Sequence, residues 1–164
     1  MLTQVCAYLK NYFLVDYLRP EEKIHYGTFA IQGNEIQALP FLEIGQYFRV
    51  VGSVFNDGVW KNVERRSGET PQPGTSAAMT DETFTGAIWA MSVPPEVVDL
   101  AEEIATWRTA NASALSGPYQ SESFGGYSYS KASGGGSGGN TSAAYGWQDQ
   151  FANRLAPYRR LSVL

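Results

Sequence analysis

The stretch that decides the fold begins with PPEVVDLAEEIATW at residues 94–107. Proline is favoured in the first turn of a helix, and the glutamate that follows suits the positive end of the helix dipole. Apolar residues then recur at helical spacing, which predicts an amphipathic helix packed in a core. Residues 147–160 read WQDQFANRLAPYRR, in which Trp147, Phe151 and Leu155 predict a second amphipathic helix. We expect Pro157 to end it.

Between these helices the composition changes to small polar residues. Residues 121–130 read SESFGGYSYS, and Phe124, Tyr127 and Tyr129 alternate with serine and glycine. This partial alternation predicts an extended arm or half of a hairpin. Residues 133–142 contain only glycine, serine, asparagine and threonine, which predicts a mobile loop.

Upstream, residues 25–91 have the texture of β-structure. The pair Gly33-Asn34 lies between two short apolar runs and predicts a hairpin with a tight turn. Asn56-Asp57-Gly58 predicts another turn, because Asp-Gly readily supplies positive φ. Further strands rich in β-branched and aromatic residues are predicted at residues 46–53, 59–63 and 82–91. Residues 65–79 carry several glycines and prolines and predict an exposed loop.

The first residues of the chain predict one more helix. Apolar side chains at helical spacing predict a short helix over residues 2–12. We therefore expect an α+β fold, with a small bundle of about three helices and an inserted antiparallel, barrel-like β subdomain. Residues 1–24 and 92–164 would form the helical part with its arm, loop and tail, and residues 25–91 the insert.

Composition limits the function classes. The chain has 164 residues, a net charge of −4, and 13% aromatic against 17% charged residues. A negative balance argues against broad binding to nucleic-acid phosphates, and abundant aromatics with few charges are typical of interface surfaces. We expect no membrane span, since no long apolar run is present, and no secretory leader.

The sequence lacks the usual catalytic patterns. It contains no phosphate-binding glycine loop, no paired-cysteine motif and no nucleophile elbow. Cys6 is the single cysteine, expected on the buried face of the first helix, and His25 is the single histidine. Nucleophile–base pairs are therefore nearly excluded. We expect no enzyme, and no catalytic, cofactor or metal site.

Two segments together resemble a known family. Residues 121–160, with SESFGGYSY, a Gly/Ser loop and a last helix ending in LAPYRR, are similar to the C-terminal half of head-tail connector (adaptor or head-completion) proteins of tailed bacteriophages. Residues 45–59, GQYFRVVGSVFNDGV, resemble a β-motif common in phage structural proteins. Members of the adaptor family are mainly helical, so the β region of this chain departs from their pattern.

The resemblance implies a structural role in the virion. Such adaptors form rings of about a dozen copies beneath the capsid portal, and a tail or stopper protein attaches below. Genomic DNA passes through the lumen without sequence-specific binding. The protein would be made in the host cytoplasm and reside in the virion neck. The arm residues Phe124, Tyr127 and Tyr129 would contact neighbouring subunits.

A basic C-terminal tail would then dock onto an acidic portal rim, although a disordered end is the simpler reading of this segment. The tail residues are Tyr158, Arg159, Arg160 and Leu161.

Other readings stay open at this point. A stopper or tail-completion protein of the same neck shares the virion location but contacts the tail. A small β-barrel binding module would recognise a ligand through Tyr47, Trp60 and Trp89. A hydrolase working through carboxylates is the least favoured, because the partners it needs are missing.

Overall fold

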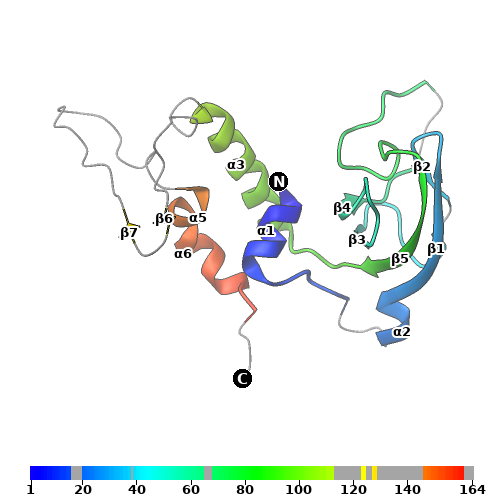
Figure 1. Ribbon diagram of the computed structural model, residues 1–164, viewed down its shortest axis with the longest axis horizontal. Coiled ribbons are helices and arrows are strands. Elements are labelled where there is room, and N and C mark those ends of the chain that lie inside the picture. The colour runs from blue at the N-terminus through cyan, green and yellow to red at the C-terminus, as the bar shows by residue number, and fades with distance from the viewer. Residues whose placement is uncertain are drawn as a thin grey trace.

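The computed structural model describes residues 1–15, 20–37, 39–64, 68–112, 123–124, 127–128 and 146–160. In this part of the chain a curled, half-barrel-like antiparallel sheet lies beside a group of helices (Figure 1). The α+β class expected from the sequence is confirmed. Two connections join the parts, one after the first helix and one before the long third helix.

The sheet has five strands in the order β2-β1-β5-β3-β4, and every pair is antiparallel. The strands are β1 (Ile24–Gln32), β2 (Glu35–Ile36), β3 (Tyr47–Val51), β4 (Gly58–Lys61) and β5 (Glu82–Ala90). The hairpin predicted at Gly33-Asn34 is confirmed, with φ of 65° and 67° at the two turn residues. Both values are positive, as a type I′ turn requires.

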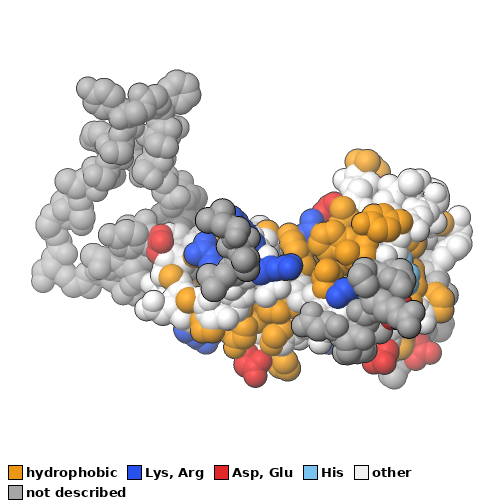
Figure 2. All heavy atoms as spheres, turned by 90° about the horizontal axis from the view of Figure 1, so that it is seen from below, with side chains coloured by type: hydrophobic (Ala, Val, Ile, Leu, Met, Phe, Trp, Pro, Cys, Tyr) orange, Lys and Arg blue, Asp and Glu red, His pale blue; other side chains and the backbone are white. Residues whose placement is uncertain are grey.

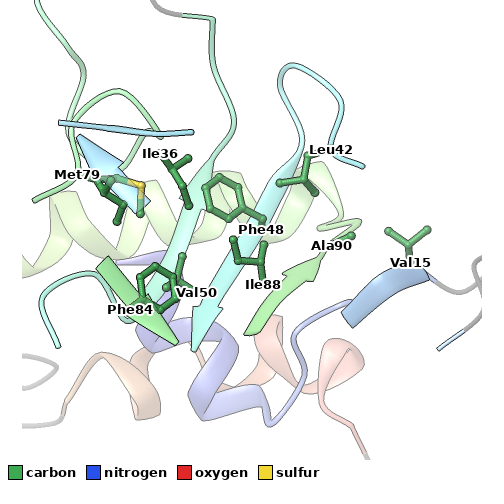
Figure 3. Packing of buried hydrophobic residues seen from close by; sticks show 10 residues of the cluster. Val15, Ile36, Leu42, Phe48, Val50, Met79, Phe84, Ile88 and Ala90 are labelled. Carbon is green, nitrogen blue, oxygen red and sulfur yellow. The ribbon is translucent and has the colours of Figure 1, made fainter. Parts of the chain in front are cut away.

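The register gives the sheet two different faces. Phe48, Val50 and Ile88 point to one face and join Ile36, Leu42, Met79 and Phe84 in a buried cluster (Figure 3). Residues directly opposite one another share a face, so Arg49 and Trp89 lie on the other side. That side faces the N-terminal segment, because Tyr12 packs against both Arg49 and Trp89.

The helices are α1 (Leu2–Leu9), α2 (Pro20–Lys23), α3 (Pro95–Ala110), α5 (Trp147–Gln150) and α6 (Ala152–Leu155), followed by the 3-10 helix η2 (Ala156–Tyr158). A second buried cluster unites α1, α3, α5 and α6 through Val5, Leu9, Val97, Leu100, Ala101, Ile104, Trp147, Phe151 and Leu155. The cluster therefore joins residues from both ends of the chain, side by side in Figure 1.

Three helix boundaries differ from the sequence-based expectation, and the strands β3, β4 and β5 also begin or end one or two residues from the predicted bounds. The first helix ends at Leu9, because Lys10 adopts a left-handed conformation with φ of 51°. The last helix is not continuous: the chain turns at Phe151, where φ is −106° and ψ is 6°. Pro157 does not end a regular α-helix but lies within η2.

The remaining expectations concern the arm and the domain division. A two-stranded hairpin pairs β6 (Ser123–Phe124) with β7 (Tyr127–Ser128). The Gly/Ser loop at 133–142 and the tail after residue 160 lie outside the described residues. The division into residues 1–24 with 92–164 and residues 25–91 stays a prediction. Among the described helices, none is both long enough and apolar enough to cross a membrane.

Candidate functional site

A basic hollow lies where the helices meet the sheet. Its volume is about 630 Å³, and it opens between the end of α1, Lys23 of α2, the end of β5 and the C-terminal segment. We call it the basic hollow. Its lining residues are Lys10, Asn11, Tyr12, Phe13, Leu14, Lys23, Trp89, Ser92, Pro94 and Arg160. Figure 2, a view from below, shows several Lys and Arg side chains beside hydrophobic ones in the middle of the molecule.

The backbone after α1 shapes one wall of the hollow. Lys10 and Phe13 both have positive φ, 51° and 46°, which is uncommon for residues other than glycine. Asn11 supports the turn, since its side-chain oxygen accepts a hydrogen bond from the Phe13 N–H at 3.0 Å. The Phe13 carbonyl in turn accepts a bond from the Ser92 N–H at 2.6 Å. These bonds hold the segment against the strand-to-helix connection.

The C-terminal segment closes the other wall. Leu155 is fully buried in the helical cluster, and the Asn11 amide donates a hydrogen bond to the Tyr158 carbonyl at 3.1 Å. The Arg160 N–H donates to the Leu9 carbonyl at 3.1 Å, and the Arg159 guanidinium lies 5.3 Å from the centre of the Tyr8 ring.

The structure thus brings the predicted tail residues Tyr158, Arg159 and Arg160 beside α1, with Arg159 and Arg160 exposed. Leu161 lies outside the described residues.

The cations of the basic hollow have no ion-pair partner in the part of the chain that the structure describes. Lys10, Lys23 and Arg160 line it, and no Asp or Glu is among its lining residues. Within the described ranges, the ion pairs are Arg49–Asp57 and Arg154–Glu103, and neither involves a cation of the hollow. Like charges held near one another attract an anionic partner and steer its approach. Aromatic walls from Tyr12, Phe13 and Trp89 add apolar contact area.

Arg49 connects the sheet to the segment after α1, and sequence reasoning did not single it out. Its guanidinium carbon lies 4.1 Å from the centre of the Tyr12 ring and 5.4 Å from that of Trp89, within the range of cation–π contacts. One terminal nitrogen reaches Asp57 at 3.5 Å. The buried Arg49 Nε and Trp89 Nε1 atoms have no hydrogen-bond partner among the described residues. An arginine inside the apolar strand YFRVV was the signal for this contact.

The predicted turn Asn56-Asp57-Gly58 lies in the connection between β3 and β4. Asn56 is 1% exposed, and its side chain bonds the Thr80 N–H and carbonyl at 2.8 and 2.9 Å and Glu82 at 2.6 Å. The Asp57 carboxylate accepts a bond from the Gly52 N–H at 3.2 Å. Gly52 and Gly58 have φ of 90° and 149°. The motif is thus the structural centre of this loop.

Glu82 completes the support of the loop from β5. Burial acts to raise the pKa of Glu82, but bonds from the Ser53 hydroxyl, the Asn56 amide and the N–H groups of Phe55 and Val54 outweigh it and lower the pKa. Hydrogen bonds to the charged form of a carboxylate have this effect. The carboxylate therefore holds both sides of the loop.

The loop displays two large apolar side chains that sequence reasoning did not single out. Val54 is 82% exposed and Phe55 is 66% exposed, while the neighbouring Ser53 and Asn56 are buried. The only sequence signal was the apolar pair directly before the Asn-Asp-Gly turn.

The other predicted site residues lie on separate elements. The backbones of Phe124 and Tyr127 pair across the β6–β7 hairpin, whereas Tyr129 lies outside the described residues. Trp60 pairs with Phe48 and packs on the sheet cluster, so it faces away from Tyr47 and Trp89. These three residues of the binding-module hypothesis do not form one surface.

Chemistry-bearing side chains are few in the described part of the chain. Cys6 is buried, and burial raises the pKa of its thiol to about 12. His25 stacks on Phe41 with 3.6 Å between ring centres, and its Nε2 atom lies 2.7 Å from the Glu22 carbonyl. No group of three or more His, Cys, Asp or Glu side chains there is arranged to hold a metal ion.

Comparisons with protein-family models, with curated proteins and with solved structures find no match for this chain.

Proposed function

We propose that this chain is a structural protein of the neck of a tailed bacteriophage, where copies form a ring that joins the capsid portal to the tail. The observation that carries the proposal is the basic hollow beside the C-terminal segment, where Lys10, Lys23 and Arg160 lack a described carboxylate partner. A surface of this kind suits an acidic segment of another protein. The resemblance of residues 45–59 and 121–160 to phage adaptors supplies the identity of that partner.

The proposal includes the division of the chain into a helical core and an inserted subdomain. Residues 1–24 and 92–164 form the helical adaptor core, and residues 25–91 form an inserted barrel-like subdomain. The two hydrophobic clusters support this division, because the helical one draws on both ends of the chain and the sheet cluster on the residues between. Val15 is an exception, since it packs in the sheet cluster.

The ring would hold about a dozen copies around a lumen through which DNA passes. The net charge of −4 favours this role, because a mildly negative wall does not retain phosphates. The cations of the basic hollow would then face the portal rim and not the DNA. The proposed location is the neck of the virion.

The proposal is tested by a photo-crosslinking amino acid at position 159 in assembled virions. Arg159 is exposed, and its guanidinium lies over the Tyr8 ring. We expect a crosslink to the portal protein, identified by mass spectrometry. A crosslinker at Tyr26, which is 81% exposed on β1, is the matched control for the basic face. A crosslink from position 159 to the tail alone would favour the stopper alternative, and absence of the protein from virions would overturn both.

Charge reversal tests the basic hollow itself. Arg160→Glu is expected to weaken binding to the crosslinked partner about tenfold, or about 1.4 kcal/mol, and to reduce the salt dependence of binding. Lys61→Glu makes the same change of charge on β4, outside the hollow, and is expected to leave the affinity unchanged. Both affinities are measured by biolayer interferometry at two salt concentrations. Equal effects of the two variants would show that only net charge matters.

A further inference from the structure

The basic hollow offers a ligand positive charge and aromatic surface together. Its cations come from separate segments of the chain and are Lys10, Lys23 and Arg160. Its aromatic lining consists of Tyr12, Phe13 and Trp89, and each of these side chains is partly buried. A volume of about 630 Å³ holds several side chains of a bound segment. A ligand that carries only charge would therefore leave the aromatic lining uncovered.

The backbone around the hollow has few N–H groups to give to an anion. These lining residues already donate their backbone N–H groups within the chain: Lys10, Asn11, Phe13, Ser92 and Arg160. Pro94, which also lines the hollow, has no N–H. Compact phosphate sites commonly depend on free backbone N–H groups. Recognition here falls to long cationic side chains, which suits carboxylates spaced along a peptide better than one compact phosphate.

A further cation lies against the aromatic lining. The Arg49 guanidinium carbon is 4.1 Å from the centre of the Tyr12 ring and 5.4 Å from that of Trp89. The two rings meet edge to face, with 5.7 Å between their centres. The face of an aromatic ring disfavours anions, and a cation held against the ring offsets this effect. The aromatic lining is therefore compatible with an acidic ligand.

Trp89 also brings a donor to this lining. Its indole Nε1 atom is buried and has no hydrogen-bond partner among the described residues. An indole nitrogen can only donate, and buried indole N–H groups usually have an acceptor. A carboxylate or carbonyl oxygen of a bound segment would supply that acceptor. The hollow thus combines cations, apolar rings and an unsatisfied donor.

We propose that the basic hollow binds a short acidic protein segment that carries a large apolar or aromatic side chain among its carboxylates. This inference rests on the neck function proposed above and names the chemistry of the partner's segment. The carboxylates pair with Lys10, Lys23 and Arg160, and the apolar side chain packs against the aromatic lining. Charge speeds the encounter, and the apolar contact distinguishes this segment from acidic segments without such a side chain.

Synthetic peptides with blocked ends test the site in the full chain. The probe is Glu-Glu-Phe-Glu-Glu, and the matched control Glu-Glu-Ala-Glu-Glu has the same charge. Binding is followed by proton–nitrogen correlation NMR of the indole groups, with the Trp89 signal assigned from Trp89→Phe. We expect the phenylalanine peptide to shift the Trp89 signal, and the alanine peptide to bind at least about tenfold more weakly. The signal of Trp147, which is buried in the helical cluster, should not shift.

A pair of charge variants tests the cations in the same assay. Lys23→Glu should weaken the phenylalanine peptide about tenfold, whereas Lys61→Glu, the same change outside the hollow, should leave its affinity unchanged. Added salt should weaken both peptides and leave the ratio of their affinities nearly unchanged, because salt screens charges and not apolar contacts.

Two outcomes would overturn the inference. One is that the phenylalanine peptide does not bind, or binds no better than the alanine peptide. The other is that inorganic phosphate or an oligothymidine strand shifts the Trp89 signal at a lower concentration than the peptide, which would assign the hollow to phosphate groups. If position 159 still crosslinks to the portal, the neck function stands and only the segment's chemistry is wrong. If the peptides behave as expected but position 159 misses the portal, the inferred chemistry stands and the proposed partner is wrong.

Discussion

The two candidate surfaces of this protein are fixed in place by different kinds of interaction. One is the exposed pair Val54 and Phe55 on the β3–β4 loop, the apolar knob, and the other is the basic hollow. The loop that carries the knob is fixed from within by Asn56 and Glu82, whose polar atoms bond to one another and to the backbone. The basic hollow is assembled from distant segments, and its cations Lys10, Lys23 and Arg160 have no ion-pair partner among the described residues. One surface is held by bonds within its own loop, whereas the other has cations without an ion-pair partner among the described residues.

The difference separates two tasks of a binding protein. A preformed apolar surface contributes mainly to the lifetime of a complex, because dissociation exposes it to water again. Uncompensated charges contribute mainly to the rate and selectivity of encounter, and their effect falls with salt. We therefore expect contacts made by the knob to resist salt, and contacts made by the basic hollow to weaken with it.

A large effect is expected from removing the hydrogen bonds that support the loop of Val54 and Phe55. Asn56→Ala removes the bonds to the Thr80 N–H, the Thr80 carbonyl and Glu82, and leaves buried polar groups without partners. The free energy of unfolding should fall by about 3 kcal/mol, measured by urea denaturation. Asn153→Ala, at an exposed position on α6, is the control and should be nearly neutral. An equal response of the two variants would show that the loop network does not hold the sheet.

A smaller effect follows from the charge of Glu82. Its pKa is lowered in the folded protein, so it contributes stability above the ordinary glutamate value of about 4.3, and this contribution is lost as the pH falls through the folded pKa. The urea midpoint of the wild type should therefore approach that of Glu82→Gln as the pH falls below the ordinary glutamate value and through the lowered folded pKa. Glu43→Gln removes an exposed carboxylate outside the loop and is the matched control for the loss of one negative charge. A gap for Glu82→Gln that does not change with pH would contradict the role of the charge.

Local sequence signals account for much of the fold. Gly33-Asn34 predicts its hairpin because a two-residue turn with positive φ needs such residues. Pro94-Pro95 predicts the start of α3, since proline fits the first helical turn. The break at Phe151 was not predictable, because Trp147, Phe151 and Leu155 give the same spacing in one helix or two short ones.

The candidate site was less predictable because its parts are far apart in the chain. The bond from the Arg160 N–H to the Leu9 carbonyl places Arg160 at the hollow, and the pairing of β5 with β3 places Trp89 there. The basic character of Arg159 and Arg160 was visible, but Lys10 and Lys23 gave no local sign of joining them. The exposure of Val54 and Phe55 was not predicted for a different reason. The turn motif predicted the loop, but not which neighbouring side chains would face water.

The smallest effect should come from the ion pair that joins α6 to α3. Arg154 donates to Glu103 at 2.7 Å, and this hydrogen bond is the main cause that lowers the pKa of Glu103. Both side chains are about half exposed, so solvent screens their attraction and little stability is expected from it. Glu103→Gln should leave the urea midpoint nearly unchanged at low and high salt.

The neighbouring Ile104 is the matched comparison for that ion pair. It is fully buried in the helical cluster, and Ile104→Ala should cost about 2–4 kcal/mol. If Glu103→Gln destabilised the protein as much as Ile104→Ala, surface charge would hold the C-terminal helices in place. Packing would then no longer explain how the wall of the basic hollow is fixed. We contrast a loop that is fixed by hydrogen bonds with a hollow whose wall is fixed by apolar packing. This contrast requires that Ile104→Ala destabilise the protein much more than Glu103→Gln.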